Sequence, residues 1–282
     1  MPAPGERRIP AGRVSLNVRE RPGGPPELLC LHGLASNALW WDPLGELLAP
    51  RHRVVAVDLR GHGLSDRPER GYGFADVVSD LETLLRQLGL QRPVAVGHSW
   101  GASVALELAA SASSVSAVVC VDGGVLDVRR VFGSNWEEAE ARMRPPQLSG
   151  LTEARVRSMV ERSGLGEELG EEEATRILLG NFEEGPNGLT PRLDLRRHME
   201  IAQALYQLDQ GELLGRVSCP VLFVMAVNDE GLAESKRAAV EKARCRLTAP
   251  SEAVFVRGVH DLPVQRPREV AAAISSFLDG LP

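Results

Sequence analysis

The pentapeptide Gly97-His98-Ser99-Trp100-Gly101 is the feature that most restricts the fold of this chain. It lies between a short apolar run, residues 94–96, and a run of helix-forming residues, 102–109. This order predicts a strand, a sharp turn and a helix. Because side chains beside the central serine would collide in so tight a turn, the two glycines remove them. We therefore expect Ser99 to be strained, with its hydroxyl projecting as a nucleophile.

Composition limits the remaining possibilities. A chain of 282 residues, 43% hydrophobic and 25% charged, can bury a sizeable core, so we expect one domain with a large insertion. No apolar stretch is long enough to span a membrane and the N-terminal residues contain no apolar signal region, which predicts a cytoplasmic protein without a membrane partner. The net charge of −6 and the scattered arginines argue against nucleic-acid binding. We expect neither disulfides nor a metal site, because the cysteines are widely spaced: Cys30, Cys120, Cys219 and Cys245.

Strand-like and helix-like segments alternate along most of the chain. Residues 14–19 alternate between apolar and polar, which is typical of a half-buried edge strand. Short, continuous apolar runs predict buried parallel strands at 28–31, 54–57, 94–96 and 118–121. Helical patterns lie between them, at 37–48, 74–88 and 102–110. This alternation predicts an α/β protein with a doubly wound sheet.

The alternation stops between about residues 125 and 216. That segment contains Glu- and Arg-rich stretches of helical character, separated by Pro and Gly. Strands then resume at 221–225 and 253–256, with helices at 233–243 and 268–278. We therefore expect a core formed by residues 1–124 and 217–282, with an all-helical insertion over residues 125–216.

Four sequence blocks resemble serine-dependent α/β-hydrolases with a helical cap. They are Leu31-His32-Gly33-Leu34, residues 58–66 (DLRGHGLSD), the Ser99 pentapeptide and Gly258-Val259-His260-Asp261. The resemblance implies a mostly parallel, eight-stranded sheet, with residues 125–216 as the cap. It implies a triad in the chain order Ser, acid, His, and a small-molecule substrate without a cofactor.

The resemblance also assigns roles to individual residues. His260 is the expected base, since it takes the proton of the Ser99 hydroxyl during attack and later returns it to the leaving group. Asp229 follows the next-to-last strand, where the family usually has its acid. Backbone N–H groups of Leu34 and Trp100 are the expected oxyanion hole, where one donor contributes roughly 2.7–4 kcal/mol in other enzymes.

The assignment of the acid leaves an alternative open. The family usually has glycine at the position of Ala226, three residues before Asp229. Asp122 ends the strand after the nucleophile helix, a place that some relatives use for the acid. We expect Asp229 to orient His260, and Asp122 is the alternative.

Other polar residues in the motifs are expected to be structural. We expect His32, His62 and His98 to form hydrogen bonds in turns or to line the pocket, and His198 to lie on the surface. The residues Asp58, Arg60 and Asp66 are expected to fix backbone turns, and Glu230 and Asp261 to be solvated or structural.

The insertion carries the information about the substrate. Its acidic residues suit solvated helix faces, and the alternative is that one or two glutamates turn inward to bind a substrate ammonium, as in the prolyl aminopeptidase branch of the family. Trp100 also resembles that branch, whereas His98 and Ala102 depart from it. Several apolar residues suit either helix packing or an acyl pocket: Trp40, Phe132, Trp136, Met143, Phe182, Leu205 and Tyr206.

Three classes of function follow. The first is hydrolysis of a carboxylic ester or lactone, of a small to medium-sized and largely apolar substrate, through an acyl-serine intermediate. The second is an aminopeptidase with the same triad, and the third is a non-catalytic binding protein on the hydrolase fold. Perhydrolysis and carbon–carbon bond cleavage use the same machinery, and the sequence leaves both of them open, together with the oligomeric state.

Overall fold

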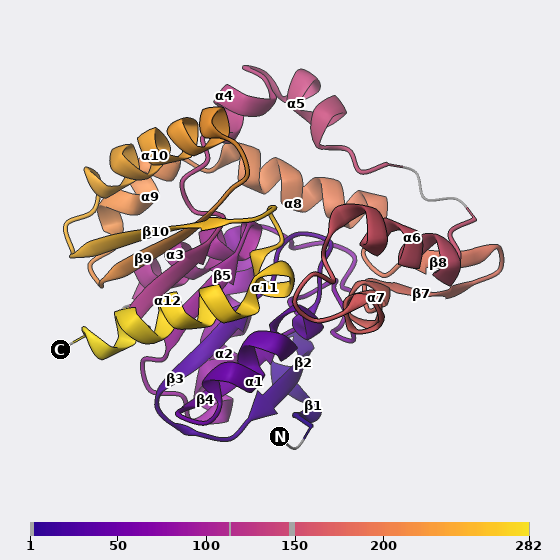
Figure 1. The fold of residues 1–282 in the computed structure, drawn as a ribbon, viewed down its shortest axis with the longest axis horizontal. Coiled ribbons are helices and arrows are strands. Elements are labelled where there is room, and N and C mark those ends of the chain that lie inside the picture. The colour runs from indigo at the N-terminus through magenta and orange to yellow at the C-terminus, as the bar shows by residue number, and fades with distance from the viewer. Residues whose placement is uncertain (1–2, 113, 147–149, 282) are drawn as a thin grey trace.

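The fold is built on one eight-stranded sheet with helices on both faces (Figure 1). The computed structural model describes residues 3–112, 114–146 and 150–281. Across the sheet the strands follow the order β1-β2-β4-β3-β5-β6-β9-β10. The pairs β1–β2 and β2–β4 are antiparallel, and all other neighbours are parallel. The strands are β1 (Gly5–Ala11), β2 (Val14–Arg21), β3 (Gly24–Leu31), β4 (His52–Val57), β5 (Val94–His98), β6 (Ala117–Val121), β9 (Val221–Val227) and β10 (Ser251–Arg257).

Helices cover both faces of this sheet, which explains the continuous apolar runs of its central strands. The helices outside the insertion are the 3₁₀ helix η1 (Ala38–Trp41), α1 (Asp42–Leu48), α2 (Phe74–Leu88), α3 (Trp100–Ala112), α10 (Glu230–Arg244), α11 (Leu262–Gln265) and α12 (Pro267–Asp279). One core cluster joins Leu29, Leu31 and their neighbours to α2, α3 and α10. The other joins Leu28 and Cys30 to α1 and α12. The predicted doubly wound, mostly parallel sheet is confirmed.

The edge of the sheet differs from the prediction. Residues 14–19 belong to β2, which is the second strand, because β1 pairs along its outer side. Only Ile9 and Ala11 of β1 are buried, so this strand carries almost no apolar pattern. Its place in the sheet depends on backbone pairing, which the sequence does not display.

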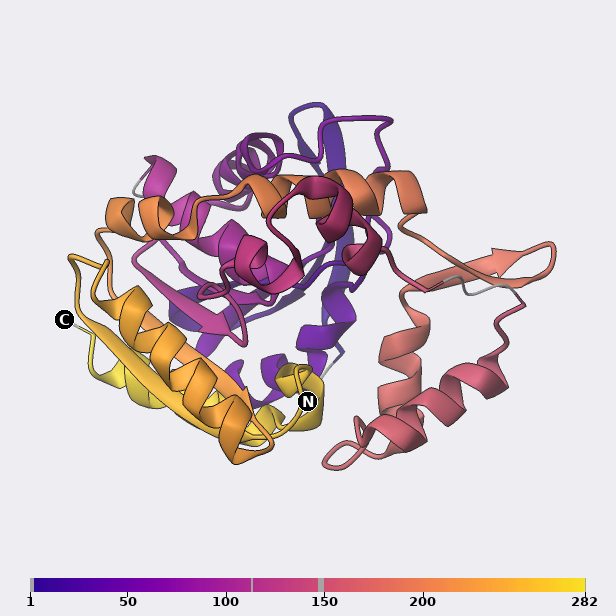
Figure 2. The same cartoon turned by 90° about the horizontal axis from the view of Figure 1, so that it is seen from above.

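The insertion, residues 125–216, is not all helical as expected. Its elements are α4 (Val128–Phe132), α5 (Trp136–Met143), α6 (Glu153–Ser163), α7 (Glu171–Leu179), β7 (Phe182–Gly185), β8 (Gly188–Pro191), α8 (Leu195–Gln207) and α9 (Gln210–Arg216). The strands β7 and β8 form an antiparallel hairpin that the sequence pattern did not reveal. Figure 2 shows α6, α7 and this hairpin to one side of the sheet, with α8 running back across the molecule. Ile201 of α8 and Leu213 of α9 join the main core.

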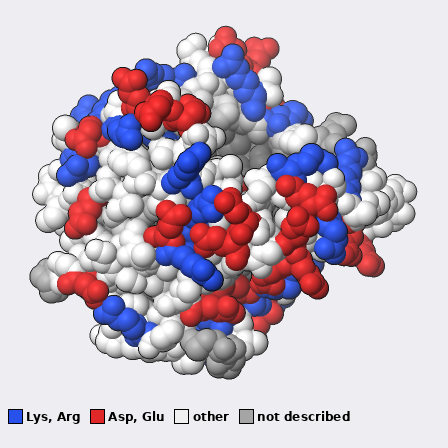
Figure 3. Space-filling model, in the orientation of Figure 1, with Lys and Arg blue, Asp and Glu red and all other residues white. Residues whose placement is uncertain are grey.

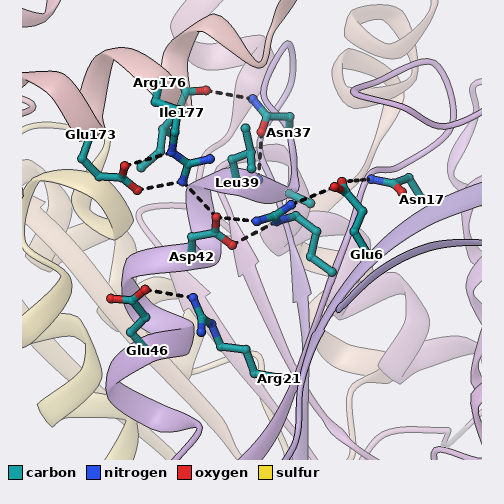
Figure 4. A network of polar contacts seen from close by, with 12 residues as sticks. Glu6, Asn17, Arg21, Asn37, Leu39, Asp42, Glu46, Glu173, Arg176 and Ile177 are labelled. Carbon is teal, nitrogen blue, oxygen red and sulfur yellow. Dashed lines mark hydrogen bonds and ion pairs between the residues drawn. The ribbon is translucent and has the colours of Figure 1, made fainter. Parts of the chain in front are cut away.

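A polar network ties the insertion to the sheet (Figure 4). Asp42 accepts two hydrogen bonds from Arg19, at 3.0 and 2.8 Å, and a third, at 3.0 Å, from Arg176 of α7. Nearby, Asn37 Nδ2 donates to the carbonyl of Ile177 at 3.2 Å. The helix α7 is thus fixed against the segment that leads from β3 into α1.

Candidate active site

Ser99 occupies the expected turn between β5 and α3. Its φ of 55° is a left-handed conformation that a serine adopts only under constraint. A Cβ atom on Gly97 would lie 2.2 Å from the carbonyl oxygen of Gly101, and one on Gly101 would lie 2.3 Å from the carbonyl oxygen of Leu31. Both positions therefore require glycine, and the turn projects the Ser99 side chain as the sequence motif predicts.

His260 lies in the loop between β10 and α11, and its Nε2 is 2.9 Å from Ser99 Oγ. Two contacts hold this loop: the Val259 N–H donates to Gln265 Oε1 at 2.7 Å, and His98 Nε2 donates to the His260 carbonyl at 2.9 Å. The His260 side chain is 53% exposed, so the imidazole is accessible from solution.

Asp122, and not Asp229, is the carboxylate that contacts His260. Asp122 Oδ2 lies 2.7 Å from His260 Nδ1. Asp122 directly follows β6 and has a φ of 43°, a second strained residue at this edge of the sheet. Ser99, His260 and Asp122 therefore form one continuous chain of hydrogen bonds.

Asp229 has a different and purely local role, which corrects the expected assignment. It is the N-cap residue of α10, and its Oδ1 accepts a hydrogen bond from the Leu232 N–H at 2.8 Å. Its side chain is exposed. An aspartate at the start of a helix satisfies one of the free N–H groups there, so the motif that suggested a triad acid is a helix cap.

Charge and burial oppose each other in this chain of hydrogen bonds. Burial disfavours ionisation of Asp122, but hydrogen bonds from His260 and Lys236 outweigh it and lower the pKa of the Asp122 carboxyl. Burial also disfavours the His260 cation, but the hydrogen bond and charge of Asp122 outweigh it and raise the pKa of His260 above 6.5. The pair thus favours an ionised carboxylate and a more basic imidazole, which suits proton abstraction from a hydroxyl.

The loop after β3 lies beside the serine. A Cβ atom on Gly33 would be 3.2 Å from Ser99 Cβ, which shows how closely the backbone approaches. Leu34 follows Gly33 in this loop, and Trp100 follows Ser99 as the first residue of α3. Neither N–H donates to another described group. They remain the candidate oxyanion hole.

The other motif histidines are structural, as expected. His32 Nδ1 donates to the Gly33 carbonyl at 2.8 Å, and its Nε2 accepts the Leu59 N–H at 3.0 Å. His62 Nε2 accepts the Ala35 N–H at 3.2 Å. Burial lowers the pKa of His32 to about 4, and that of His62 to about 3. Both are neutral near pH 7, and they hold the loop that carries Leu34.

The acidic residue Asp58 fixes turns in the same way. Its two carboxylate oxygens accept the N–H groups of Ala38, at 2.6 Å, and Leu64, at 2.9 Å. Arg60 makes two hydrogen bonds of 2.6 Å to Asp80. These charges are therefore occupied in holding the loops around the site.

Most acidic residues of the insertion face solvent or form ion pairs, and the half-buried Glu200 accepts the N–H groups of Gly71 and Tyr72 at 2.9 Å. Glu167 pairs with Arg266, and Glu183 pairs with Arg67. In the described part of the insertion no Asp or Glu is buried. Figure 3 shows acidic and basic side chains interspersed on one face of the molecule. A buried carboxylate, which an aminopeptidase needs for the substrate amine, is thus not found among the described residues of the insertion.

The apolar residues of the insertion are packed into clusters. Phe132, Trp136, Met143, Leu205 and Tyr206 pack together between α4, α5 and α8, and Phe182 packs in a separate cluster. This agrees with the helix-packing interpretation.

Trp40 connects the insertion to the site. It packs with Val160 and Ile177 of the insertion, and its ring stacks on His98 with centroids 6.1 Å apart. Since His98 contacts the carbonyl of His260, the packing of α6 and α7 reaches the loop that carries the base.

Comparison with known proteins identifies the family of this chain. Residues 28–273 match the family model described as the alpha/beta hydrolase family. The chain belongs to the alpha/beta hydrolase family. Over 117 residues it is 44% identical to 2-(acetamidomethylene)succinate hydrolase of Mesorhizobium japonicum, a match that covers 41% of this chain and 42% of the relative. It is also 28% identical to Epoxide hydrolase A of Mycobacterium tuberculosis, over 100% of this chain and 99% of that protein.

The fold is shared with solved hydrolases. The crystal structure of E-2-(acetamidomethylene)succinate hydrolase superimposes with a TM-score of 0.79 and 27% identity, over 98% of this chain and 99% of that one. Together with the family match, this makes the protein an enzyme of the alpha/beta hydrolase superfamily. In the described residues no helix has the length and apolar character needed to cross a membrane.

Proposed function

We propose that this protein is a serine hydrolase that cleaves a carboxylic ester or lactone of a small to medium-sized, largely apolar substrate. The observation that carries the proposal is the chain of hydrogen bonds from Ser99 through His260 to Asp122, at 2.9 and 2.7 Å. We also propose that residues 125–216 form a cap over this site. The cap supplies the surface that selects the substrate.

The mechanism has two acyl-transfer steps. Ser99 Oγ attacks the substrate carbonyl while His260 Nε2 takes the hydroxyl proton, and Asp122 stabilises the imidazolium that forms. The N–H groups of Leu34 and Trp100 stabilise the oxyanion. His260 then gives its proton to the leaving alcohol, which leaves an acyl-serine. In the second step water attacks the acyl carbonyl while His260 takes its proton, and His260 then returns that proton to Ser99 Oγ as the acid is released.

A serine nucleophile suits acyl substrates better than alkyl ones. Attack of Ser99 on an acyl carbon leaves an ester, which the same base can hydrolyse through water. Attack on an epoxide or alkyl halide would leave a stable ether and stop the enzyme after one turnover. The matches to Epoxide hydrolase A and, over 102 residues, to a fluoroacetate dehalogenase of a Burkholderia species therefore support the common fold rather than a common reaction.

An amide is the second candidate substrate. It is favoured by the similarity to 2-(acetamidomethylene)succinate hydrolase, whose structure matches 98% of this chain. Amide cleavage uses the same two steps, with His260 protonating a leaving nitrogen. Cleavage of an N-terminal residue is less well supported, because no buried carboxylate of the described insertion is available for a free amine.

The test is hydrolysis of p-nitrophenyl esters of increasing acyl length, with p-nitroacetanilide and proline p-nitroanilide included. We expect ester turnover, and we expect Ser99→Ala to lower kcat by about 10⁴-fold or more. The melting temperature should stay unchanged, because among the described residues the hydroxyl bonds only to His260. Equal activity of Ser99→Ala and wild type would refute the mechanism. Preference for the acetanilide would favour an amidase, and a preference for proline p-nitroanilide would restore the aminopeptidase.

A fluorophosphonate probe provides a second test that does not depend on the substrate. It reacts with activated serines, so Ser99 should be labelled in the wild type and unlabelled in Ser99→Ala. Failure to label Ser99 would favour a non-catalytic binding protein.

A further inference from the structure

The carboxylate of Asp122 has a second charged partner that no motif predicted. Lys236 Nζ lies 2.6 Å from Asp122 Oδ1 and 2.7 Å from the Ala226 carbonyl oxygen. The Ala226 N–H donates to the same Oδ1 at 2.9 Å. Only 20% of the Lys236 side chain is exposed. The ammonium thus lies between α10 and the end of β9 and not in bulk solvent.

These contacts divide the two carboxylate oxygens between different partners. Oδ1 is held by Lys236 and Ala226, and Oδ2 faces His260. Rotation of the carboxylate about its Cβ–Cγ bond would break the two hydrogen bonds that Oδ1 accepts, one of them charge-assisted and therefore strong. Oδ2 is consequently fixed toward the imidazole.

We propose that Lys236 is a positioning residue of the triad, which orients Asp122 toward His260 and offsets part of the carboxylate's negative charge. This inference rests on the proposed serine-hydrolase function. The residue touches neither Ser99 nor the reacting atoms, so its effect passes through Asp122. It is one of only two lysines in the chain.

The charge of Lys236 opposes protonation of the base. The groups around His260 are Asp122 after β6, Asp261 in its own loop, His98 at the end of β5 and Lys236 on α10. The two carboxylates raise the pKa of His260, whereas Lys236 lowers it. Neutral His98 donates to the backbone of His260 and carries no charge near pH 7, since burial lowers its pKa to about 3. Lys236 is thus the one cation among these four groups.

The consequence for pH dependence has a definite sign. His260 acts as a base only when it is neutral, so the rate rises as the pH passes its pKa. Removal of the Lys236 charge takes away the cation that opposes the attraction of Asp122, and therefore raises the pKa of His260 further. The acid limb of the pH profile then moves to higher pH.

The test compares Lys236→Met with Lys236→Arg, and uses Lys242→Met as the matched control. Lys242 is the other lysine of the chain and lies exposed on the same helix, α10. The rate of Ser99 labelling by a fluorophosphonate is measured from pH 5 to 9. The His260 imidazole is titrated in parallel by NMR, with its Cε1–Hε1 signal identified by its absence in His260→Gln.

In Lys236→Met we expect the labelling rate at pH 7 to fall by about tenfold or more, from loss of a charge-assisted hydrogen bond. The acid limb and the NMR midpoint should both move to higher pH. Lys236→Arg should return both midpoints toward wild type, and Lys242→Met should leave them unchanged. If Lys236→Met does not fold, Lys236→Gln, which lacks the charge but can still donate a hydrogen bond, replaces it under the same criteria.

An unchanged NMR midpoint in a folded, uncharged variant would overturn the inference, even if its labelling rate fell, because lost packing alone lowers a rate without moving a titration. The NMR titration also separates this inference from the proposed function. If wild-type Ser99 is not labelled, the proposed function fails, and the titration still decides whether Lys236 sets the charge state of His260.

Discussion

Replacement of Asp122 by asparagine is the sharpest test of the site, because the structure fixes how the new amide must lie. Oδ1 of Asp122 accepts hydrogen bonds from Ala226 N–H and Lys236 Nζ. The asparagine amide has only one oxygen. Because both donors, the Ala226 N–H and Lys236 Nζ, point at the Oδ1 position, the amide oxygen must stay there. The NH₂ group then points at His260 Nδ1. It can donate only if the imidazole proton moves to Nε2, where it faces Ser99.

The wrong tautomer removes the base. With its proton on Nε2, His260 cannot accept the proton of the Ser99 hydroxyl, and the carboxylate that stabilised the imidazolium is also lost. The same substitution in the triad of a serine protease lowers kcat about 10⁴-fold. That ratio corresponds to about 5.4 kcal/mol, at about 1.36 kcal/mol for each factor of ten. Because Asp122 is buried behind His260, we expect most of this loss in kcat and little change in KM.

The assay is steady-state hydrolysis of the best p-nitrophenyl ester, together with fluorophosphonate labelling. Asp229→Asn is the matched control, since it makes the same chemical change at the residue that the sequence favoured. Asparagine caps a helix about as well as aspartate, so this variant should keep both its stability and a kcat within about twofold of wild type. The reasoning fails if Asp122→Asn keeps more than about a tenth of wild-type kcat, or if Asp229→Asn loses as much as Asp122→Asn.

Two further predictions concern pH and stability. In the wild type the acid limb of kcat/KM should have its midpoint above pH 6.5, because burial lowers the pKa of His260 but Asp122 raises it by more; a midpoint below 6.5 in a pH profile would contradict this. Asp42→Ala should lower the free energy of unfolding in urea by about 3 kcal/mol, since it deprives Arg19, whose side chain is only 12% exposed, of its bidentate partner. Arg176→Ala, at a side chain that is 46% exposed, should lower the free energy of unfolding by only about 0.5–1 kcal/mol. Equal losses from Asp42→Ala and Arg176→Ala would contradict the view that the buried Arg19–Asp42 pair is the stronger part of the network in Figure 4.

Much of the fold could be predicted because its signals are local. The strands β3, β4, β5 and β6 are apolar on both faces, and the Ser99 turn has its two glycines within one short motif, although the contact that requires Gly101 is with Leu31 of β3. The strand β1 could not be predicted, because its first four residues are all exposed. Only its backbone pairing with β2 makes it a strand of the sheet. The hairpin of β7 and β8 has only four residues in each strand, too few for a period to appear.

The acid could not be assigned from sequence for a different reason. Asp122 follows β6 and Asp229 follows β9, and these two strands are parallel neighbours in the sheet. Both loops therefore emerge at the same edge, within reach of the loop that carries His260. The choice depends on the strained backbone at Asp122 and on the start of α10, which uses Asp229 as its cap. Neither is visible in a local motif.

The end of β9 still contributes to the triad, although its aspartate does not. Ala226 lies at the position where the family usually has glycine, and its N–H donates a hydrogen bond to Asp122. Its carbonyl accepts a hydrogen bond from Lys236, in the first half of α10. The end of β9 thus supplies a donor for the acid after β6, and its carbonyl holds the cation that α10 supplies. The cap at Asp229 begins the helix that brings the Lys236 ammonium within 2.6 Å of Asp122. The two candidate acids are therefore coupled, one as the partner of His260 and the other as the start of the helix that holds that partner in place.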